Sequence, residues 1–414
     1  MQGPRLSTLA WRNIWRNRRR TLITLFSIAF GVFLAVLFTG LGDSTYGQMI
    51  DHSARLSGGH VVVQHPEYAE TPSLKRSLQQ TDALRALVEG DPDVTHVVPR
   101  VSGAAMLSTS TGSVGAMLLG IDPKAEDSET LGIIDALAEG EFFTNADDKG
   151  IILGSTLAEN LGVDLGKKVI FTVTDKRGDI SSGLARVSGI VDTGSPSIDG
   201  GICLLPIDSL RGILAYEADE LTQLAVFVDG HRNSTAVAQR LRDDRPENAA
   251  ILTWDEAQPE LAAYINMETS STMLLELIIT VLIAAGIFNT LFVSVMERMR
   301  EFGIMAAIGF SSAQLFALVL WESLWLSLCG LIAGGLVTAY PYYYLNTTGL
   351  DLSTMVGEGA EIAGVTMDPI LYVEIYGPNV LFIALAIFIA TMSAGLYPAW
   401  RAGRIAPVDT IRIV

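Results

Sequence analysis

Charged and apolar side chains are interleaved in a short segment between two long apolar stretches. Two pairs of opposite charge stand three residues apart, a spacing at which side chains meet on a helix: Glu297 with Arg300, and Arg298 with Glu301. Apolar side chains recur along the same helix, and a glycine follows as a stop: Met299, Phe302, Met305 and Gly309. The pattern predicts a short amphipathic helix, which is either a plain connector or a docking surface for a partner.

A second residue that could do chemistry is Glu322, about ten residues into the next apolar stretch. An ionisable side chain inside a membrane is costly and is by default a candidate functional group. Two roles are open. We favour a packing group that forms hydrogen bonds between helices, and the alternative is a proton relay.

No catalytic, metal-binding or cofactor-binding motif occurs elsewhere. The chain lacks G-x-S-x-G, H-E-x-x-H, C-x-x-C and G-x-G-x-x-G. The segment 162–168 is similar to a phosphate loop, but it is one residue too short and lacks Ser or Thr after its lysine. His60 and His65 are an odd number of residues apart, so on one strand they face opposite sides. We therefore expect a chain that is not an enzyme, with no catalytic residue, metal or cofactor of its own.

The composition is that of a membrane protein. Hydrophobic residues make up 49% of the 414 residues and charged residues 18%, and the mean hydropathy is +0.37. The net charge of −17 argues against nucleic-acid binding, which requires a surplus of Lys and Arg. Two cysteines far apart exclude a disulfide framework.

Four apolar stretches are long enough to cross about 30 Å of hydrocarbon. They are residues 21–42, 274–296, 312–340 and 379–398. The first has a basic segment before it, as a signal peptide would. However, its apolar run is too long for a signal peptide and no A-x-A cleavage site follows, so we predict a retained anchor.

The distribution of charge predicts the orientation. Arginines gather in residues 1–20, 297–311 and 399–414, whereas residues 341–378 hold five acids and no Lys or Arg. Because basic segments stay on the cytoplasmic side, both termini are expected inside and residues 43–273 outside. Residues 1–20 also have the pattern of an amphipathic helix that lies in the membrane surface.

The segment 43–273 is predicted to be a mixed α and β domain. The runs with strand character are His60–Gln64, Ala116–Ile121, Val169–Thr174, Ala185–Val191, Ile202–Leu205 and Leu224–Asp229. The runs with helix character are Thr81–Val88, Ser155–Leu161 and Ser234–Arg242. The third and fourth strands are expected to form a hairpin whose tip is Lys176–Gly183.

Several segments, in order along nearly the whole chain, resemble the MacB/FtsX-like ABC transporter permeases, the type VII family. They are Leu9–Arg20, Gly150–Gly162, Val187–Asp192, Glu297–Gly309, Glu322 with Gly330, Gly334 and Gly335, and Tyr397–Arg412. The layout is closest to that of the lipoprotein-releasing, Lol-type permeases. No fused ATPase domain is present, unlike in MacB, and the expected hairpin tip is shorter than the Lol hook that recruits a carrier.

The resemblance implies four transmembrane helices with a large α+β extracytoplasmic domain inserted between helices 1 and 2. It implies a bacterial inner-membrane permease that pairs with a second copy or a paralogue on a cytoplasmic ATPase dimer, which holds ATP and Mg²⁺. It also implies that the short amphipathic helix is the coupling helix. The coupling residues would be Glu297, Arg298, Met299, Arg300, Glu301, Phe302, Gly303, Met305 and Gly309.

The expected cargo is a lipoprotein or another amphiphile. The alternatives are drug or peptide efflux through an adaptor, regulation of a cell-wall hydrolase, and, least favoured, a membrane-anchored ectoenzyme. A periplasmic carrier or adaptor is a possible further partner. Acyl chains leaving the bilayer need an apolar shelter, which we place on the first and second spans, although the same residues could simply face lipid or each other. They are Val36, Leu37, Phe38, Leu41, Met273, Leu274, Leu277 and Ile278.

Overall fold

The computed structural model describes residues 3–79, 81–243, 248–353, 361–362, 365–366 and 370–404. The end of the predicted tail, residues 405–414, and parts of the predicted loop 341–378 lie outside the described residues. The chain divides into two compact units. The described residues of 1–45, 267–351 and 370–414 form a helical unit. Those of 46–266 and 352–369 form an α+β unit.

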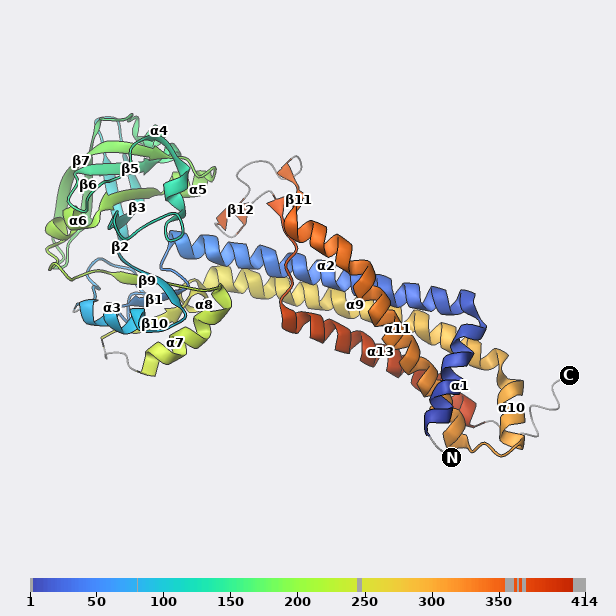
Figure 1. Cartoon of the computed structure of the whole chain (residues 1–414). Helices are drawn as coiled ribbons and strands as arrows, with labels where there is room; N and C mark the ends of the chain where they lie inside the picture. Colours follow the sequence, from blue (N-terminus) through green and yellow to red (C-terminus); the bar gives the residue numbers. More distant parts are fainter. Residues whose placement is uncertain are drawn as a thin grey trace. The chain divides into compact units, whose positions relative to one another are not determined.

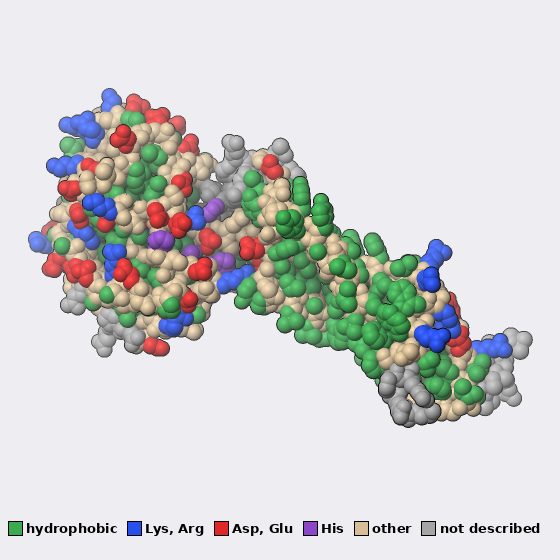
Figure 2. All heavy atoms as spheres, in the orientation of Figure 1, with side chains coloured by type: hydrophobic (Ala, Val, Ile, Leu, Met, Phe, Trp, Pro, Cys, Tyr) green, Lys and Arg blue, Asp and Glu red, His purple; other side chains and the backbone are tan. Residues whose placement is uncertain are grey.

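Long helices make up the helical unit (Figure 1). Its helices, two of which continue into the other unit, are α1 (Gly3–Arg16), α2 (Arg18–Leu56), α9 (Pro259–Glu297), α10 (Met299–Ala307), α11 (Ser312–Thr347) and α13 (Gly377–Gly403). Four of them, α2, α9, α11 and α13, are long and apolar enough to cross a membrane. Hydrophobic side chains cover most of the face of this unit seen in Figure 2, and Lys and Arg side chains gather at the end that carries α1 and α10.

Glycines set how closely the spans approach one another. A Cβ added to Gly330 of α11 would lie 2.6 Å from Cγ2 of Ile28, and one added to Gly334 would lie 2.7 Å from Cβ of Val32. Both values are below any ordinary van der Waals contact. Helices α2 and α11 therefore pack with the α11 backbone directly against branched side chains of α2, as small residues permit in membranes.

A ten-stranded sheet organises the described part of the α+β unit. Its order is β10-β1-β9-β2-β3-β8-β5-β7-β4, and β6 pairs with β2 and β7. The strands are β1 (Val61–Gln64), β2 (Val94–Ser108), β3 (Ser113–Ile121), β4 (Leu137–Gly140), β5 (Gly150–Gly154), β6 (Lys168–Thr174), β7 (Ile180–Val191), β8 (Ile202–Pro206), β9 (Gln223–Val228) and β10 (Ala250–Thr253). Among the pairs of these strands in the described residues, β3–β8 and β5–β7 are parallel and the others are antiparallel.

Short helices accompany this sheet. They are α3 (Thr81–Glu89), α4 (Ser155–Leu161), α5 (Pro196–Asp199), α6 (Ile207–Leu214), α7 (Ser234–Asp243) and α8 (Trp254–Ala257), with the 3₁₀ turns η1 (Gly132–Ala136) and η2 (His231–Asn233). The apolar side chains of strands and helices meet in one large core that includes Val63, Leu107, Phe171 and Leu210.

The sequence missed the longest strand, β2. Proline normally demotes a run to an edge strand because it has no backbone N–H to donate, and Pro99 lies inside β2. In the structure Pro99 lies opposite Leu224 of β9, whereas pairing with β3 on the other side begins only at Arg100. Proline is tolerated there because only one flank of β2 is paired at that point.

The predicted hairpin is confirmed, but its predicted tip, Lys176–Gly183, is wrong in extent. Strands β6 and β7 pair from Lys168 with Arg186 to Thr174 with Ile180. The turn is therefore only residues 175–179. One carboxylate oxygen of Asp175 accepts hydrogen bonds from the backbone N–H groups of Arg177 and Asp179, at 2.9 Å each, which tightens the turn.

A buried ion pair joins two segments of the α+β unit. Nε of Arg100 donates to Oε1 of Glu126 at 2.7 Å, and both side chains are fully buried. The guanidinium also donates to the carbonyl oxygens of Ser57 and Thr130. Removing one partner of such a pair typically costs about 3–5 kcal/mol. Nothing in the local sequence marks this pair, because its partners come from separate segments.

Candidate functional site: an ion-pair cluster around a short helix

Glu322 lies where three helices meet. Its carboxylate accepts hydrogen bonds from Nη1 of Arg298, at 2.9 and 3.1 Å, and from Nδ2 of Asn13, at 2.9 Å. Arg298 stands between α9 and α10, and Asn13 belongs to α1. These contacts are those of a packing group that ties α1, α10 and α11 together. Sequence reasoning singled out Glu322 but not its partners.

Two further ion pairs attach the N-terminal helices to the same place. Arg20 contacts Glu297 at 2.6 Å, and Arg16 contacts Glu301 at 2.6 Å. The hydrogen bond from Arg16 is the main reason that the pKa of Glu301 is held below its ordinary value. The predicted pair of Arg298 with Glu301 forms, at 3.2 Å. The predicted pairing of Glu297 with Arg300 is not among the ion pairs of the described residues. The helix breaks at Arg298, which removes the helical spacing, and Glu297 contacts Arg20 instead.

The two faces of α10 have different environments. Phe302 and Gly303 are buried, and Met299 and Met305 pack against the same core cluster as Phe302. On the outer face, Ile304 is 54% exposed and Ile308, which caps the helix, is 73% exposed. Arg300 lies one turn before Ile304, so these three side chains follow one another along the same face.

The ends of α10 follow from its sequence. Arg298 leaves the helical conformation (φ −100°, ψ 11°) and separates α10 from α9. At the other end, Gly309 takes φ +104°. Its N–H donates to Ala306 O, and the N–H of Phe310 donates to Met305 O. These two bonds form a Schellman motif, in which a left-handed residue such as glycine is favoured at this position. The predicted stop at Gly309 is confirmed.

The residues of the predicted substrate path lie on adjacent parts of α2 and α9, and all but Val36 are exposed or half-buried. Thr39 of α2 donates a hydrogen bond to the carboxylate of Glu276 of α9, so the segments 37–41 and 273–278 lie side by side. The exposed apolar side chains there are Phe38, Met273, Leu274, Leu277 and Ile278, with Leu37 and Leu41 half-buried. Val36, in contrast, is buried in the core of the helical unit.

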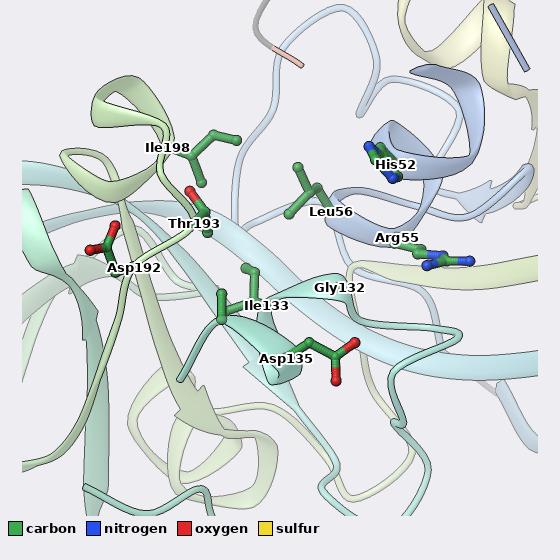
Figure 3. Close-up of a pocket in the computed structure, with 10 residues that line it drawn as sticks. His52, Arg55, Leu56, Gly132, Ile133, Asp135, Asp192, Thr193 and Ile198 are labelled. Atoms are coloured by element: carbon green, nitrogen blue, oxygen red, sulfur yellow. The ribbon is translucent and has the colours of Figure 1, made fainter. Parts of the chain in front are cut away.

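The α+β unit has a polar cavity of about 400 Å³ that the sequence did not predict (Figure 3). His52 and Arg55 line it from α2, Asp135 from η1, and Asp192 from the end of β7. Leu56, Ile133 and Ile198 supply its apolar walls. Among the described residues, no group of three or more His, Cys, Asp or Glu side chains could hold a metal ion.

Two family descriptions match the chain. One is a MacB-like periplasmic core domain, over residues 21–244, and the other is an FtsX-like permease C-terminal region, over residues 273–407. Among relatives, the chain is 21% identical over 415 residues to the lipoprotein-releasing system transmembrane protein LolE of Haemophilus influenzae, which covers 97% of this chain and 98% of that one. It is 24% identical over 348 residues to the lipoprotein-releasing protein LolC of Xylella fastidiosa, covering 79% and 80%.

A similar match is found with the macrolide export ATP-binding/permease protein MacB of Nitrobacter winogradskyi. It is 24% identical and covers 95% of this chain but 58% of that longer protein. Among solved structures, the periplasmic region of MacB from Actinobacillus actinomycetemcomitans aligns with a TM-score of 0.35 and 16% identity. That alignment covers 50% of this chain and 94% of the other.

Proposed function

Because this chain belongs to the MacB/FtsX-like family of ABC transporter permeases, we propose that it is a non-catalytic permease subunit that converts ATP hydrolysis by a separate cytoplasmic ATPase into movement of its extracytoplasmic domain. ATP and Mg²⁺ are held by that ATPase, and this chain holds no cofactor. The subunit works in a dimer with a second copy or a paralogue in the inner membrane. Its relatives include permease components of ABC transporters, which supports an ATPase partner.

The outer face of α10 is the observation that carries this proposal. Ile304 and Ile308 are apolar and exposed on a helix whose opposite face is buried. Exposed apolar side chains beside a charge are typical of a docking surface. We assign ATPase contact to Arg300, Ile304 and Ile308. Among the residues that the sequence marked, Phe302 and Gly303 instead hold α10 on the helical unit.

The ion pairs connect the region of α10 to the membrane-spanning helices. Arg298 joins the start of α10 to Glu322 in α11, and Glu301 of α10 pairs with Arg16 of α1. Glu297, the last residue of α9, pairs with Arg20 of α2 one residue before this joint. A push on α10 is therefore transmitted to α1, α2 and α11 together. This is how we propose that closure of the ATPase dimer reaches the spans.

The orientation that we propose follows the basic segments. Both termini and α10 are cytoplasmic, and the α+β domain is a periplasmic insertion between α2 and α9. Arg16, Arg20 and Arg300 then all lie on the cytoplasmic side, as the distribution of basic residues requires.

For the cargo we propose a lipoprotein or a similar amphiphile. The full-length match with lipoprotein-releasing relatives supports it, and so do the apolar side chains around the bond of Thr39 with Glu276. The second candidate is efflux of a small molecule through an adaptor, which is favoured by the match of nearly the whole chain with export permeases. A photo-crosslinker placed at Leu274 separates the two candidates. If the cargo is a lipoprotein, the probe captures an acylated protein before ATP is added and no longer does so afterwards.

The test of the proposal is binding of the ATPase that co-purifies with the full chain. We expect Ile304→Asp to weaken ATPase binding roughly tenfold. The apolar contact that Ile304 makes when the ATPase covers it is replaced by a charge, and a tenfold loss corresponds to about 1.4 kcal/mol. The matched control is Ile180→Asp on β7, which is 79% exposed and makes the same chemical change on the α+β unit. Equal binding by both variants and the unmodified chain would remove α10 from the coupling role.

A further inference from the structure

An apolar groove of about 330 Å³ opens among three of the spans, α2, α11 and α13. Its walls are Val32 and Val36 of α2, Gly335 and Ala339 of α11, and Ile383 and Ala384 of α13. Thr338 also lines it, but its hydroxyl donates to Gly334 O at 2.7 Å within the same helix. The groove therefore offers a ligand almost nothing but hydrocarbon.

One end of the groove is closed by a hydrogen-bonded rim. Ile375 and Tyr342 line this end, and the N–H of Ile375 donates to the phenol oxygen of Tyr342. The start of α13 is fixed to α2, because the N–H of Tyr376, just before α13, and the Asn379 side chain in its first turn both donate to Asp43, at 2.9 and 2.8 Å. The groove thus runs from a polar rim into the apolar depth of the unit.

Tyrosines surround this rim. The exposed ones are Tyr340, Tyr343, Tyr344 and Tyr376. Tyrosine is enriched where membrane helices pass from hydrocarbon to headgroups, because its ring is apolar and its hydroxyl is polar. The rim therefore lies at the headgroup level of one leaflet, and the groove extends from it toward the acyl chains.

Small side chains create the space. Gly334 is in tight contact with Val32, but an added Cβ on its neighbour Gly335 would meet nothing within 4 Å. Water is disfavoured in an apolar cavity, and an empty one loses dispersion contacts along its walls. One water molecule takes up about 30 Å³ in the liquid, and a methylene group is of similar size, so the groove has room for roughly ten methylene groups.

We propose that this groove holds one acyl chain of a bilayer phospholipid, with the headgroup at the rim of Asp43, Tyr342 and Asn379. The medium around the spans is itself phospholipid, so this ligand is present at every moment. The bound chain fills the gap between α2, α11 and α13 and fixes their spacing. The site shares only Val36 with the substrate path predicted from the sequence, and its other walls belong to α2, α11 and α13. It requires only that the spans lie in a membrane.

Filling the groove tests the proposal. In Gly335→Leu the new side chain occupies the space that the acyl chain would take. Gly286→Leu is the matched control, because Gly286 is also an exposed glycine of a span with nothing within 4 Å of an added Cβ. Ala384→Phe fills the groove from α13, should Gly335→Leu fail to fold. Folding is checked by circular dichroism and by the thermal midpoint.

The full chain is purified in mild detergent, and retained phospholipid is counted by native mass spectrometry. We expect one tightly held phospholipid per chain in the unmodified protein and in Gly286→Leu, and at least a tenfold loss of that species in Gly335→Leu or Ala384→Phe. A phospholipid with a diazirine in its acyl chain should crosslink to peptides of residues 331–342 and 380–384. Equal retention in a folded groove-filling variant, or crosslinks spread evenly over all four spans, overturns the proposal. Capture of a triacylated lipopeptide but no phospholipid overturns it as well.

Discussion

Glu322 shows how one costly side chain can be accommodated inside an apolar helix. Its carboxylate is matched by the guanidinium of Arg298 and by the amide of Asn13, so no charge is left without a partner. The sequence could mark Glu322, because a charge in an apolar run is conspicuous. It could not identify the partners, since Asn13 is 309 residues away and Arg298 lies across a helix break.

Substitutions at this pair have different expected costs. Glu322→Gln keeps an acceptor for Arg298 but loses the charge, so we expect a loss of about 1–3 kcal/mol. Glu322→Leu leaves the guanidinium unmatched and should cost about 3–5 kcal/mol. Thermal unfolding of the purified full chain measures both.

The double variant Arg298→Leu/Glu322→Leu is the control for this prediction. It removes both charges, so it should be more stable than Glu322→Leu alone. If the stability losses of Glu322→Leu and Arg298→Leu add up to the loss of the double variant, the two residues are not coupled. A strongly pH-dependent loss of transport in a stable Glu322→Gln variant would instead favour the proton-relay role.

At the scale of elements, the β6–β7 hairpin is fastened through Glu220. Burial raises the pKa of this carboxyl group, but hydrogen bonds from Lys176, Ser77 and the Glu217 N–H outweigh it and hold the pKa below its ordinary value of 4.5. Lys176 belongs to the hairpin turn, so the carboxylate links that turn to the segment before β9. Because the pKa is lowered on folding, the ionised carboxylate stabilises the folded state.

This sign gives a pH dependence. The stabilisation by Glu220 is full above about pH 4.5 and is lost as the pH falls through the lower folded-state pKa. At neutral pH, Glu220→Gln should speed hydrogen exchange of the β6 and β7 amides roughly tenfold relative to the unmodified chain. The two proteins should converge in acid when compared at the same pH. A difference that persists unchanged in acid would show that the carboxylate charge is not responsible.

Local patterns predicted most of these elements but not their surroundings. The six strand runs and three helix runs all occur, since alternation and helical periodicity are properties of neighbouring residues. The apolar face of α10 with Met299, Phe302 and Met305 was predicted, but the exposed Ile304 and Ile308 were not. Phe302 and Ile304 are both apolar, and only packing against neighbouring helices distinguishes them. Likewise β2 was missed because tolerance of Pro99 depends on its neighbouring strands.

At the scale of the whole molecule, the lengths of the apolar stretches predicted four spans, and the described residues contain four helices long and apolar enough to cross a membrane. The order of strands in the sheet could not be predicted from the sequence, because β1 pairs with β9 and β10, which come more than 150 residues later in the chain. Such pairings depend on which surfaces can be buried together. The polar cavity beside Arg55 could not be predicted for the same reason, since its walls come from separate segments of the chain.

The proposed orientation gives a prediction for the whole chain. Single cysteines are introduced at Ser181 and at Arg404, in a background where Cys329 is replaced by serine. Cys203 needs no replacement, because it is buried and burial raises the pKa of its thiol to about 12, which makes it unreactive. In intact spheroplasts an impermeant thiol reagent should label the cysteine at position 181 and leave the one at position 404 unlabelled until lysis. Labelling at 404 before lysis would reverse the orientation.

The contact of Gly330 and Gly334 with α2 has a consequence for how this chain tolerates change. Alanine is more hydrophobic than glycine, so either replacement would look like an improvement to any scale that scores membrane insertion. In this fold the added methyl group would press on Ile28 or Val32, whose branching at Cβ leaves them few other rotamers. The packing of α2 on α11 therefore depends on the shape of these side chains, and a variant library ranked by hydrophobicity alone would favour the replacements that disturb it.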